Sequence, residues 1–149
     1  MRIVLQRVSR ATVRVEQQKI TSVDKGIVLL IGIGKADEAL DLPRLAQKVV
    51  ELRIFEDQAG KMNRSLRDVG GEILAVSQFT LYGDTKKGRR PSFSKAASPQ
   101  EAKPLFDAFI SALKTKGALV KTGIFGAKME VELVNDGPVT FILELASHA

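Results

Sequence analysis

Two short segments combine side chains and backbone groups that could do chemistry. The segment Ser77-Gln78-Phe79-Thr80-Leu81 puts three polar side chains where an apolar run ends. It is either a site built at a strand end or an ordinary polar strand end. The segment Asn135-Asp136-Gly137-Pro138-Val139-Thr140 is either a plain turn between two strands or holds a cis Gly–Pro bond that aims two carbonyl oxygens at a ligand.

The composition limits which catalytic groups are available. The 149 residues include no Cys and one His, at position 148. Disulfides, thiolate zinc sites and Cys nucleophiles are therefore excluded, and imidazole chemistry is nearly excluded. The acidic residues are scattered, so we expect no metal site and no cofactor. Catalysis would have to use hydroxyls, carboxylates, amides, backbone groups or the substrate itself.

Two glycine-containing segments imitate nucleotide-binding motifs but lack the residues that those motifs need. Gly32-Ile33-Gly34 follows a predicted strand, yet no third glycine completes the dinucleotide fingerprint. Residues 83–90 imitate a P-loop but end in Arg-Arg, where Lys followed by Ser or Thr is required to hold phosphate and Mg²⁺. Nucleotide hydrolysis is therefore rejected.

Positive charge is concentrated in one loop. The chain has 23 Lys and Arg against 17 Asp and Glu, a net charge of +6, and residues 84–95 hold five basic groups and one acid. Lys86, Lys87, Arg89 and Arg90 form either a solvated loop or a grip on a phosphate backbone. Aromatic residues are few and mostly in core-like positions, which favours helical RNA or DNA over stacked single strands.

Strand-like patterns dominate the two ends of the chain. Residues 11–16 alternate between apolar and polar, which is typical of a strand with one wet face, and residues 26–33 are apolar throughout, as in a fully buried strand. Residues 56–71 are polar and contain glycine, which predicts a hairpin and loop. The predicted strands are 2–8, 11–16, 26–33, 72–79, 118–122, 127–134 and 138–145.

Capping residues and apolar spacing predict two helices. Asp41 is a suitable N-cap with Pro43 near the first helical position. Ser98 and Glu101 form a capping box around a second start, and the apolar stripe of that helix is assigned to the core. The stripe comprises Ala102, Leu105, Phe106, Phe109 and Leu113.

The order of these elements, βββ-α-β-α-βββ, predicts the fold class. We expect one α+β domain over residues 1–149, built from mostly antiparallel, barrel-like β-sheets with two helices packed on one face.

Four motifs together resemble one family. They are LQRV at 5–8, KMNRS at 61–65, SQFTL at 77–81 and NDGPVT at 135–140. In this combination they resemble D-aminoacyl-tRNA deacylase, the D-tyrosyl-tRNA deacylase family, and the resemblance spans the whole chain. It implies an enzyme that hydrolyses the ester bond of D-aminoacyl-tRNA to free D-amino acid and tRNA. Glycyl-tRNA mischarged on tRNA-Ala is also an implied substrate.

By resemblance, the chain forms a homodimer with active sites at the subunit interface. Gly137 and Pro138 would be a cis pair that enters the partner's pocket and excludes an L side chain. Chiral proofreading would then come from steric rejection, and not from affinity for the D side chain. Arg7 matches the opening motif and would brace this turn.

The catalytic residues that the resemblance implies are Gln78, Phe79 and Thr80. The backbone N–H groups of Phe79 and Thr80 are candidates to bind the ester carbonyl oxygen as negative charge develops on it.

Ser77, Phe125 and Met129 are implied substrate-binding residues. Phe125 and Met129 match positions that pack around the terminal adenosine. For both residues, an ordinary position in the hydrophobic core is the alternative interpretation, with about equal support. The basic loop fits binding of the tRNA acceptor stem.

Two mechanisms are considered for the ester. The hydroxyl of Thr80 could be a nucleophile, but it would need a base, and the motif offers neither imidazole nor Lys. An aminoacyl ester is already activated, and the terminal ribose carries a neighbouring 2′-hydroxyl. We therefore favour substrate-assisted hydrolysis, in which the enzyme positions the ester and the tRNA hydroxyl helps to activate water.

Two competing functions stay open: a non-catalytic RNA-binding module, and a stand-alone editing factor for L-mischarged tRNA. No apolar run reaches the 18 or so residues that a membrane span needs. The segment MRIVLQRVSR lacks a signal-peptide core. We therefore expect a cytoplasmic protein with no membrane partner.

Overall fold

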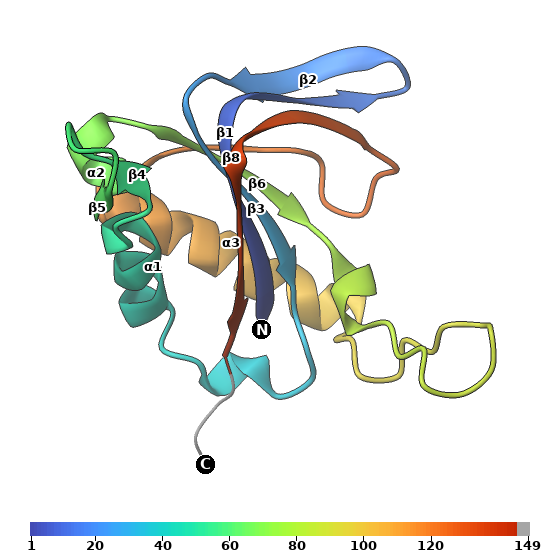
Figure 1. Ribbon diagram of the computed structural model, residues 1–149. Helices are drawn as coiled ribbons and strands as arrows, with labels where there is room; N and C mark the ends of the chain where they lie inside the picture. Colours follow the sequence, from blue (N-terminus) through green and yellow to red (C-terminus); the bar gives the residue numbers. More distant parts are fainter. Residues whose placement is uncertain (146–149) are drawn as a thin grey trace.

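The computed structural model describes residues 1–145, so His148 lies outside the described residues. A mixed six-stranded sheet curls into a nearly closed barrel (Figure 1). Its strands pair in the order β2 (Gln18–Val23), β1 (Arg2–Val15), β3 (Gly26–Gly32), β6 (Glu72–Ser77) and β7 (Leu119–Thr122), while β8 (Glu130–Glu144) pairs with β1. β4 (Phe55–Glu56) and β5 (Met62–Arg64) form a separate hairpin.

β1 organises the sheet because it pairs along both of its edges. Its first half pairs with β3, its second half pairs with β2, and β8 runs along its other edge, all antiparallel. β3 with β6, and β6 with β7, are parallel pairs. A helix separates the two strands of each parallel pair in the chain, as such crossovers require.

Two helices cover one face of the sheet (Figure 1). They are α1 (Leu42–Glu51) and α3 (Pro99–Thr115), and they pack against each other. Both predicted caps are confirmed: the Asp41 side chain accepts a hydrogen bond from the Arg44 N–H, and Ser98 forms a capping box with Glu101. The remaining short elements are α2 (Leu66–Val69) and the 3₁₀ turns η1 (Asp37–Ala39) and η2 (Phe79–Tyr82).

Two hydrophobic clusters lie on opposite faces of β3. Ile27, Leu29 and Ile31 pack under the helices, and Val28 belongs to a smaller cluster with Val13 and other side chains from the strands. All of these side chains are buried. The prediction that residues 26–33 form a strand buried on both faces is therefore confirmed, and so is the core position of the α3 stripe.

The predicted α+β class, with a barrel-like sheet and two helices on one face, is confirmed. Several strand boundaries were wrong. Predicted strands 2–8 and 11–16 form the single strand β1, predicted strands 127–134 and 138–145 form β8, and β2 was not predicted. Polar residues between the paired segments suggested breaks, but β1 and β8 pair on both sides of the irregular stretches, which form bulges.

Candidate active site

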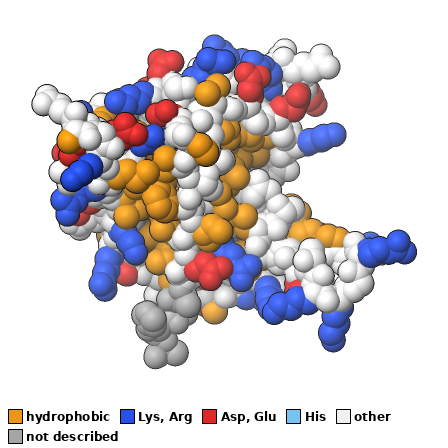
Figure 2. Space-filling model, viewed as in Figure 1, with side chains coloured by type: hydrophobic (Ala, Val, Ile, Leu, Met, Phe, Trp, Pro, Cys, Tyr) orange, Lys and Arg blue, Asp and Glu red, His pale blue; other side chains and the backbone are white. Residues whose placement is uncertain are grey.

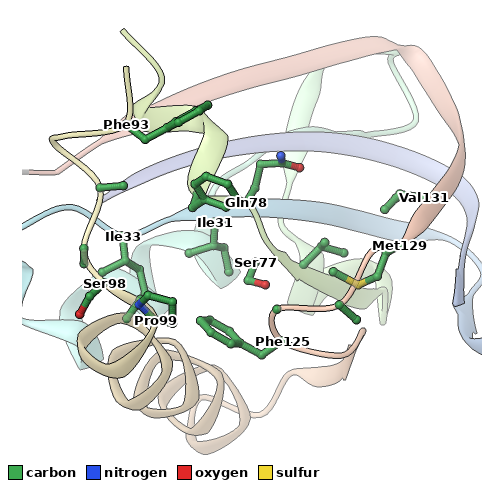
Figure 3. A pocket seen from close by; sticks show the side chains of 17 residues that line it. Ile31, Ile33, Ser77, Gln78, Phe93, Ser98, Pro99, Phe125, Met129 and Val131 are labelled. Atoms are coloured by element: carbon green, nitrogen blue, oxygen red, sulfur yellow. The ribbon is translucent and has the colours of Figure 1, made fainter. Parts of the chain in front are cut away.

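A cleft of about 580 Å³ opens where β6 ends beside the first turn of α3 (Figure 3). The segment between β7 and β8 supplies a further wall. The lining is mainly apolar, and no described residue in it carries an ionisable side chain. Five predicted site residues line the cleft: Ser77, Gln78, Phe79, Phe125 and Met129.

The SQFTL segment turns sharply where it leaves the sheet. Ser77 ends β6 beside Ile31 of β3, and the Gln78 N–H donates to the Ile31 carbonyl at 2.8 Å. η2 then begins at Phe79. Among residues 1–145, the N–H groups of Phe79 and Thr80 donate no hydrogen bond, as is usual at the start of a helical turn. Two neighbouring donors are thus free to bind an oxygen atom.

Thr80 is placed differently from its neighbours in the motif. It is exposed and lies outside the residues that line the cleft. The side-chain amide of Gln78 donates a hydrogen bond to the Thr80 hydroxyl. An amide N–H cannot take up a proton, so this contact does not activate the hydroxyl as a nucleophile.

Phe125 and Met129 combine the two roles that the sequence left open, namely a place in the binding site and a place in the core. Both are half-buried and both line the cleft. The Phe125 ring also packs against Phe106 of α3, with ring centres 5.8 Å apart. Figure 3 shows Ser77, Phe125 and Met129 grouped around the cavity, from β6 and from the segment that precedes β8.

Sequence reasoning missed the wall formed by the start of α3 and the loop before it. Phe93, Ser98 and Pro99 line the cleft, but Ser98 and Pro99 were interpreted only as a helix start. The prediction that the aromatic residues lie mostly in the core is wrong for Phe79, Phe93 and Phe141, which are exposed. One signal in the sequence could have indicated that Phe93 is exposed: it lies inside the basic loop and outside any apolar stripe.

Gly137 and Pro138 lie outside this cleft in their own chain. Both are exposed, and the peptide bond between them is cis. They belong to a bulge of β8 in which residues 136–139 stand opposite Arg7 of β1 alone. The Asn135 side-chain amide spans the bulge, donating to the carbonyls of Arg7 at 2.8 Å and Val139 at 2.9 Å.

Arg7 is buried beneath this turn, with 4% of its surface exposed. Its Nε donates to the Asp136 carbonyl at 3.1 Å, and its Nη1 donates to the Ile54 carbonyl at 2.9 Å. The carboxylates of Asp136 and Glu56 lie 3.4 Å and 3.7 Å from the guanidinium. The planar guanidinium of Arg7 therefore links the turn to the segment that follows α1. Binding two separate carbonyls in this way requires the forked geometry of arginine.

Lys86, Lys87, Arg89 and Arg90 extend from the body on residues 84–92, which we name the basic arm (Figures 1 and 2). All four are exposed, and none forms an ion pair within the described chain. The arm is closed by reciprocal hydrogen bonds between Asp84 and Ser92, at 2.7 Å and 2.9 Å.

The Asp84 carboxylate reinforces the base of the basic arm. It accepts the Lys86 N–H at 2.9 Å. This hydrogen bond is the main reason that the pKa of Asp84 lies below its usual value, and the nearby Lys95 ammonium lowers the pKa further.

Tyr82 ends η2 and is the single tyrosine of the chain. Burial, assisted by the Asp37 carboxylate, raises the pKa of its phenol to about 12, although the Arg2 guanidinium opposes the shift. The Arg2 guanidinium carbon lies 4.8 Å from the Tyr82 ring centre. Because Tyr82 borders the SQFTL turn, its titration reports whether this region is folded.

Within residues 1–145, no cluster of three His, Asp or Glu is placed to hold a metal ion. None of the helices in that range is both long and apolar enough to cross a membrane.

Residues 4–144 match the family described as D-Tyr-tRNA(Tyr) deacylase. The chain is 56% identical to a D-aminoacyl-tRNA deacylase of Geobacillus sp. (strain WCH70), over 97% of this chain and 95% of the relative. It is 57% identical to one from Thermomicrobium roseum (strain ATCC 27502 / DSM 5159 / P-2), over 98% and 95%.

Two solved structures share the fold of this chain. The chain superposes on the c-Myc DNA Unwinding Element Binding Protein with a TM-score of 0.90 and 41% identity, covering 98% of this chain and 99% of that one. A probable eukaryotic D-amino acid tRNA deacylase shares the fold, with a TM-score of 0.82 and 19% identity, over 97% and 98%. The predicted family and the predicted class of enzyme are confirmed. The chain belongs to the D-Tyr-tRNA(Tyr) deacylase family, a family of hydrolases.

Proposed function

We propose that this protein hydrolyses the ester bond of D-aminoacyl-tRNA, releases the free D-amino acid and the tRNA, and spares L-aminoacyl-tRNA. The observation that carries the proposal is the cleft itself. In a chain of this family, two backbone N–H groups that have no acceptor within residues 1–145 adjoin a cleft whose described lining has no ionisable side chain. Such a site can hold a neutral ester and stabilise a developing oxyanion, but it supplies no general base of its own.

The reaction that fits this site needs little from side chains. Water adds to the ester carbonyl carbon, and the N–H groups of Phe79 and Thr80, which donate no hydrogen bond within residues 1–145, would donate to the resulting oxyanion. The bond from carbon to the ribose oxygen then breaks, and that oxygen takes the proton that water releases. We assign the activation of water to the vicinal hydroxyl of the terminal ribose, because no basic side chain lines the described cleft.

The place of Thr80 can be tested by substitution. We expect Thr80→Ala to retain kcat within about tenfold of the unsubstituted enzyme, because its hydroxyl contacts only an amide donor in the described chain. Single-turnover hydrolysis of D-Tyr-tRNA measures this. A nucleophile would behave differently: Thr80→Ala would lose at least about 10⁴-fold, while Thr80→Ser would recover the rate.

Selectivity for D substrates is proposed to come from the turn at Gly137 and Pro138. The turn lies outside the cleft of its own chain, is exposed, and is held by the buried Arg7. These features suit a rigid element that enters the cleft of a second copy. Its carbonyl oxygens would face the substrate's Cα and leave no room for an L side chain. Glycine has no side chain, so glycyl-tRNA mischarged on tRNA-Ala would also be accepted.

A homodimer is supported by the outer surface of β8. Within the described chain this strand pairs only with β1 and leaves its other edge free. Val134, Phe141 and Ile142 on β8 are exposed, Ile142 with 70% of its surface in contact with solvent. Figure 2 shows hydrophobic side chains gathered across the middle of this face. An unpaired edge strand that exposes apolar side chains is a suitable surface for contact with another chain.

The substrate also defines the other partners. The basic arm offers four cations, which form no ion pair with any residue from 1 to 145, to the phosphates of the tRNA acceptor stem. We propose a cytoplasmic location because the tRNA substrate is charged and used there.

One assay separates this function from its competitors. The protein is incubated with D-Tyr-tRNA, L-Tyr-tRNA and Gly-tRNA, and the loss of each ester is followed. We expect D-Tyr-tRNA and Gly-tRNA to be hydrolysed and L-Tyr-tRNA to be spared. Binding without turnover would support a non-catalytic RNA-binding module, and faster loss of the L ester would support an editing factor for L-mischarged tRNA.

A further inference from the structure

Two phenylalanine side chains stand exposed at the rim of the cleft. Phe79 has 59% of its surface exposed and Phe93 has 40%. Phe79 begins η2, and Phe93 lies in the loop between the basic arm and α3. Leaving large apolar side chains in water forgoes the stabilisation that burial would give. An exposed aromatic pair beside a cleft therefore points to a ligand that covers it.

The two rings contact each other. They meet edge to face, with centres 5.2 Å apart and planes at 64°. A Cβ atom on Gly83 would lie 3.1 Å from Cε1 of Phe93, so the Phe93 ring rests directly on the Gly83 backbone. Phe93 is thus held between Phe79 and Gly83 without help from a ligand, which lowers the entropic cost of binding.

The position of the pair relates it to two other features. Both residues line the cleft, and Figure 3 labels Phe93 among the lining side chains. Phe93 also directly follows Ser92, which closes the basic arm with Asp84. The pair therefore adjoins both the cleft and the base of the basic arm, where a strand with its terminal nucleoside in the cleft and its phosphates on the arm would run.

We propose that Phe79 and Phe93 form a stacking platform for the nucleobase next to the terminal adenosine, in the single-stranded end of the tRNA. This rests on the proposed function, because it assumes that the terminal aminoacyl-adenosine occupies the cleft. Stacking of a base on an aromatic side chain tolerates any sequence, because every base has a π-face. The platform binds the strand and takes no part in the hydrolysis of the ester.

Hydrolysis of a long and a short substrate tests this role. For Phe93→Ala we expect the KM for D-Tyr-tRNA to rise roughly 5- to 100-fold. The KM for 3′-O-D-tyrosyl-adenosine, which lacks the stacked base, should rise by a clearly smaller factor, because Phe93 also lines the cleft. Phe93→Trp is expected to restore binding of the tRNA. Ile20→Ala, which removes an exposed apolar side chain on β2, serves as the control and should affect neither substrate.

A binding measurement makes the test independent of turnover. An uncharged RNA minihelix with 2-aminopurine next to its terminal adenosine should lose fluorescence when the unsubstituted protein binds, and Phe93→Ala should abolish this quenching. Unchanged quenching in Phe93→Ala, or equal loss of activity on both substrates, would overturn the platform. Quenching by an unsubstituted protein that hydrolyses neither ester would support the platform and refute the proposed function.

Discussion

Gly137→Ala is expected to lower the ratio of D-Tyr-tRNA to L-Tyr-tRNA hydrolysis by about a hundredfold or more. Gly137 has a φ of 137°, which side-chain-bearing residues rarely adopt. A Cβ there would lie 2.6 Å from Cγ2 of Val139 and 3.2 Å from Nη2 of Arg7. The turn must therefore move, and a steric filter fails when its position changes by about 1 Å.

The measurement is the ratio of kcat/KM for the two esters. Gly117→Ala is the matched control, because Gly117 also has a positive φ, of 90°, but has open space where a Cβ would lie. Tyr82 reports folding, since its absorbance titration should stay near pH 12 in a folded variant. An unchanged ratio in folded Gly137→Ala would contradict the steric filter at this turn.

Arg7→Lys should weaken the same discrimination in the same direction. Lysine keeps the charge, but a single ammonium cannot reproduce the contacts of the guanidinium with the carbonyls of both Asp136 and Ile54. Arg14→Lys provides the comparison: Arg14 also links β1 to β8 through Glu132, but it is partly exposed and away from the turn. A rate effect equal in both variants would show that Arg7 acts through general stability.

Removing the charge of the basic arm should have the second large effect. Changing Lys86, Lys87, Arg89 and Arg90 together to Gln is expected to weaken tRNA binding strongly at low salt. It should also make the plot of log binding constant against log salt less steep by about 4, because each phosphate-binding cation contributes about one to that slope. Equilibrium binding of uncharged tRNA between low and moderate salt measures both quantities.

A charge-matched variant separates the arm from net charge. Four exposed basic residues elsewhere can be changed to Gln together: Lys19, Arg44, Lys48 and Lys114. This variant should retain nearly the original slope. The arm variant should also keep full activity on 3′-O-D-tyrosyl-adenosine, which has no phosphates. Equal slopes in the two variants would show that the arm does not contact the tRNA backbone.

Much of the fold could be predicted because its signals are local. Ser98 and Glu101 form a capping box with their own backbone neighbours, and the stripe on α3 follows from helical spacing alone. The buried run at residues 26–33 likewise identified β3. The predicted strand breaks at residues 9–10 and 135–137 were wrong, because β1 and β8 pair on both sides of each stretch and so continue through it.

The sequence by itself determined the family and the chemical limits of the site. Its motifs identified the deacylase resemblance, and the lack of Cys together with a single His removed most catalytic side chains from consideration. Only the tertiary structure placed Phe93 opposite Phe79, excluded Thr80 from the cleft lining, and set Arg7 beneath the Gly137 turn. These contacts join residues distant in the chain, and burial and distance exist only once the sheet has closed.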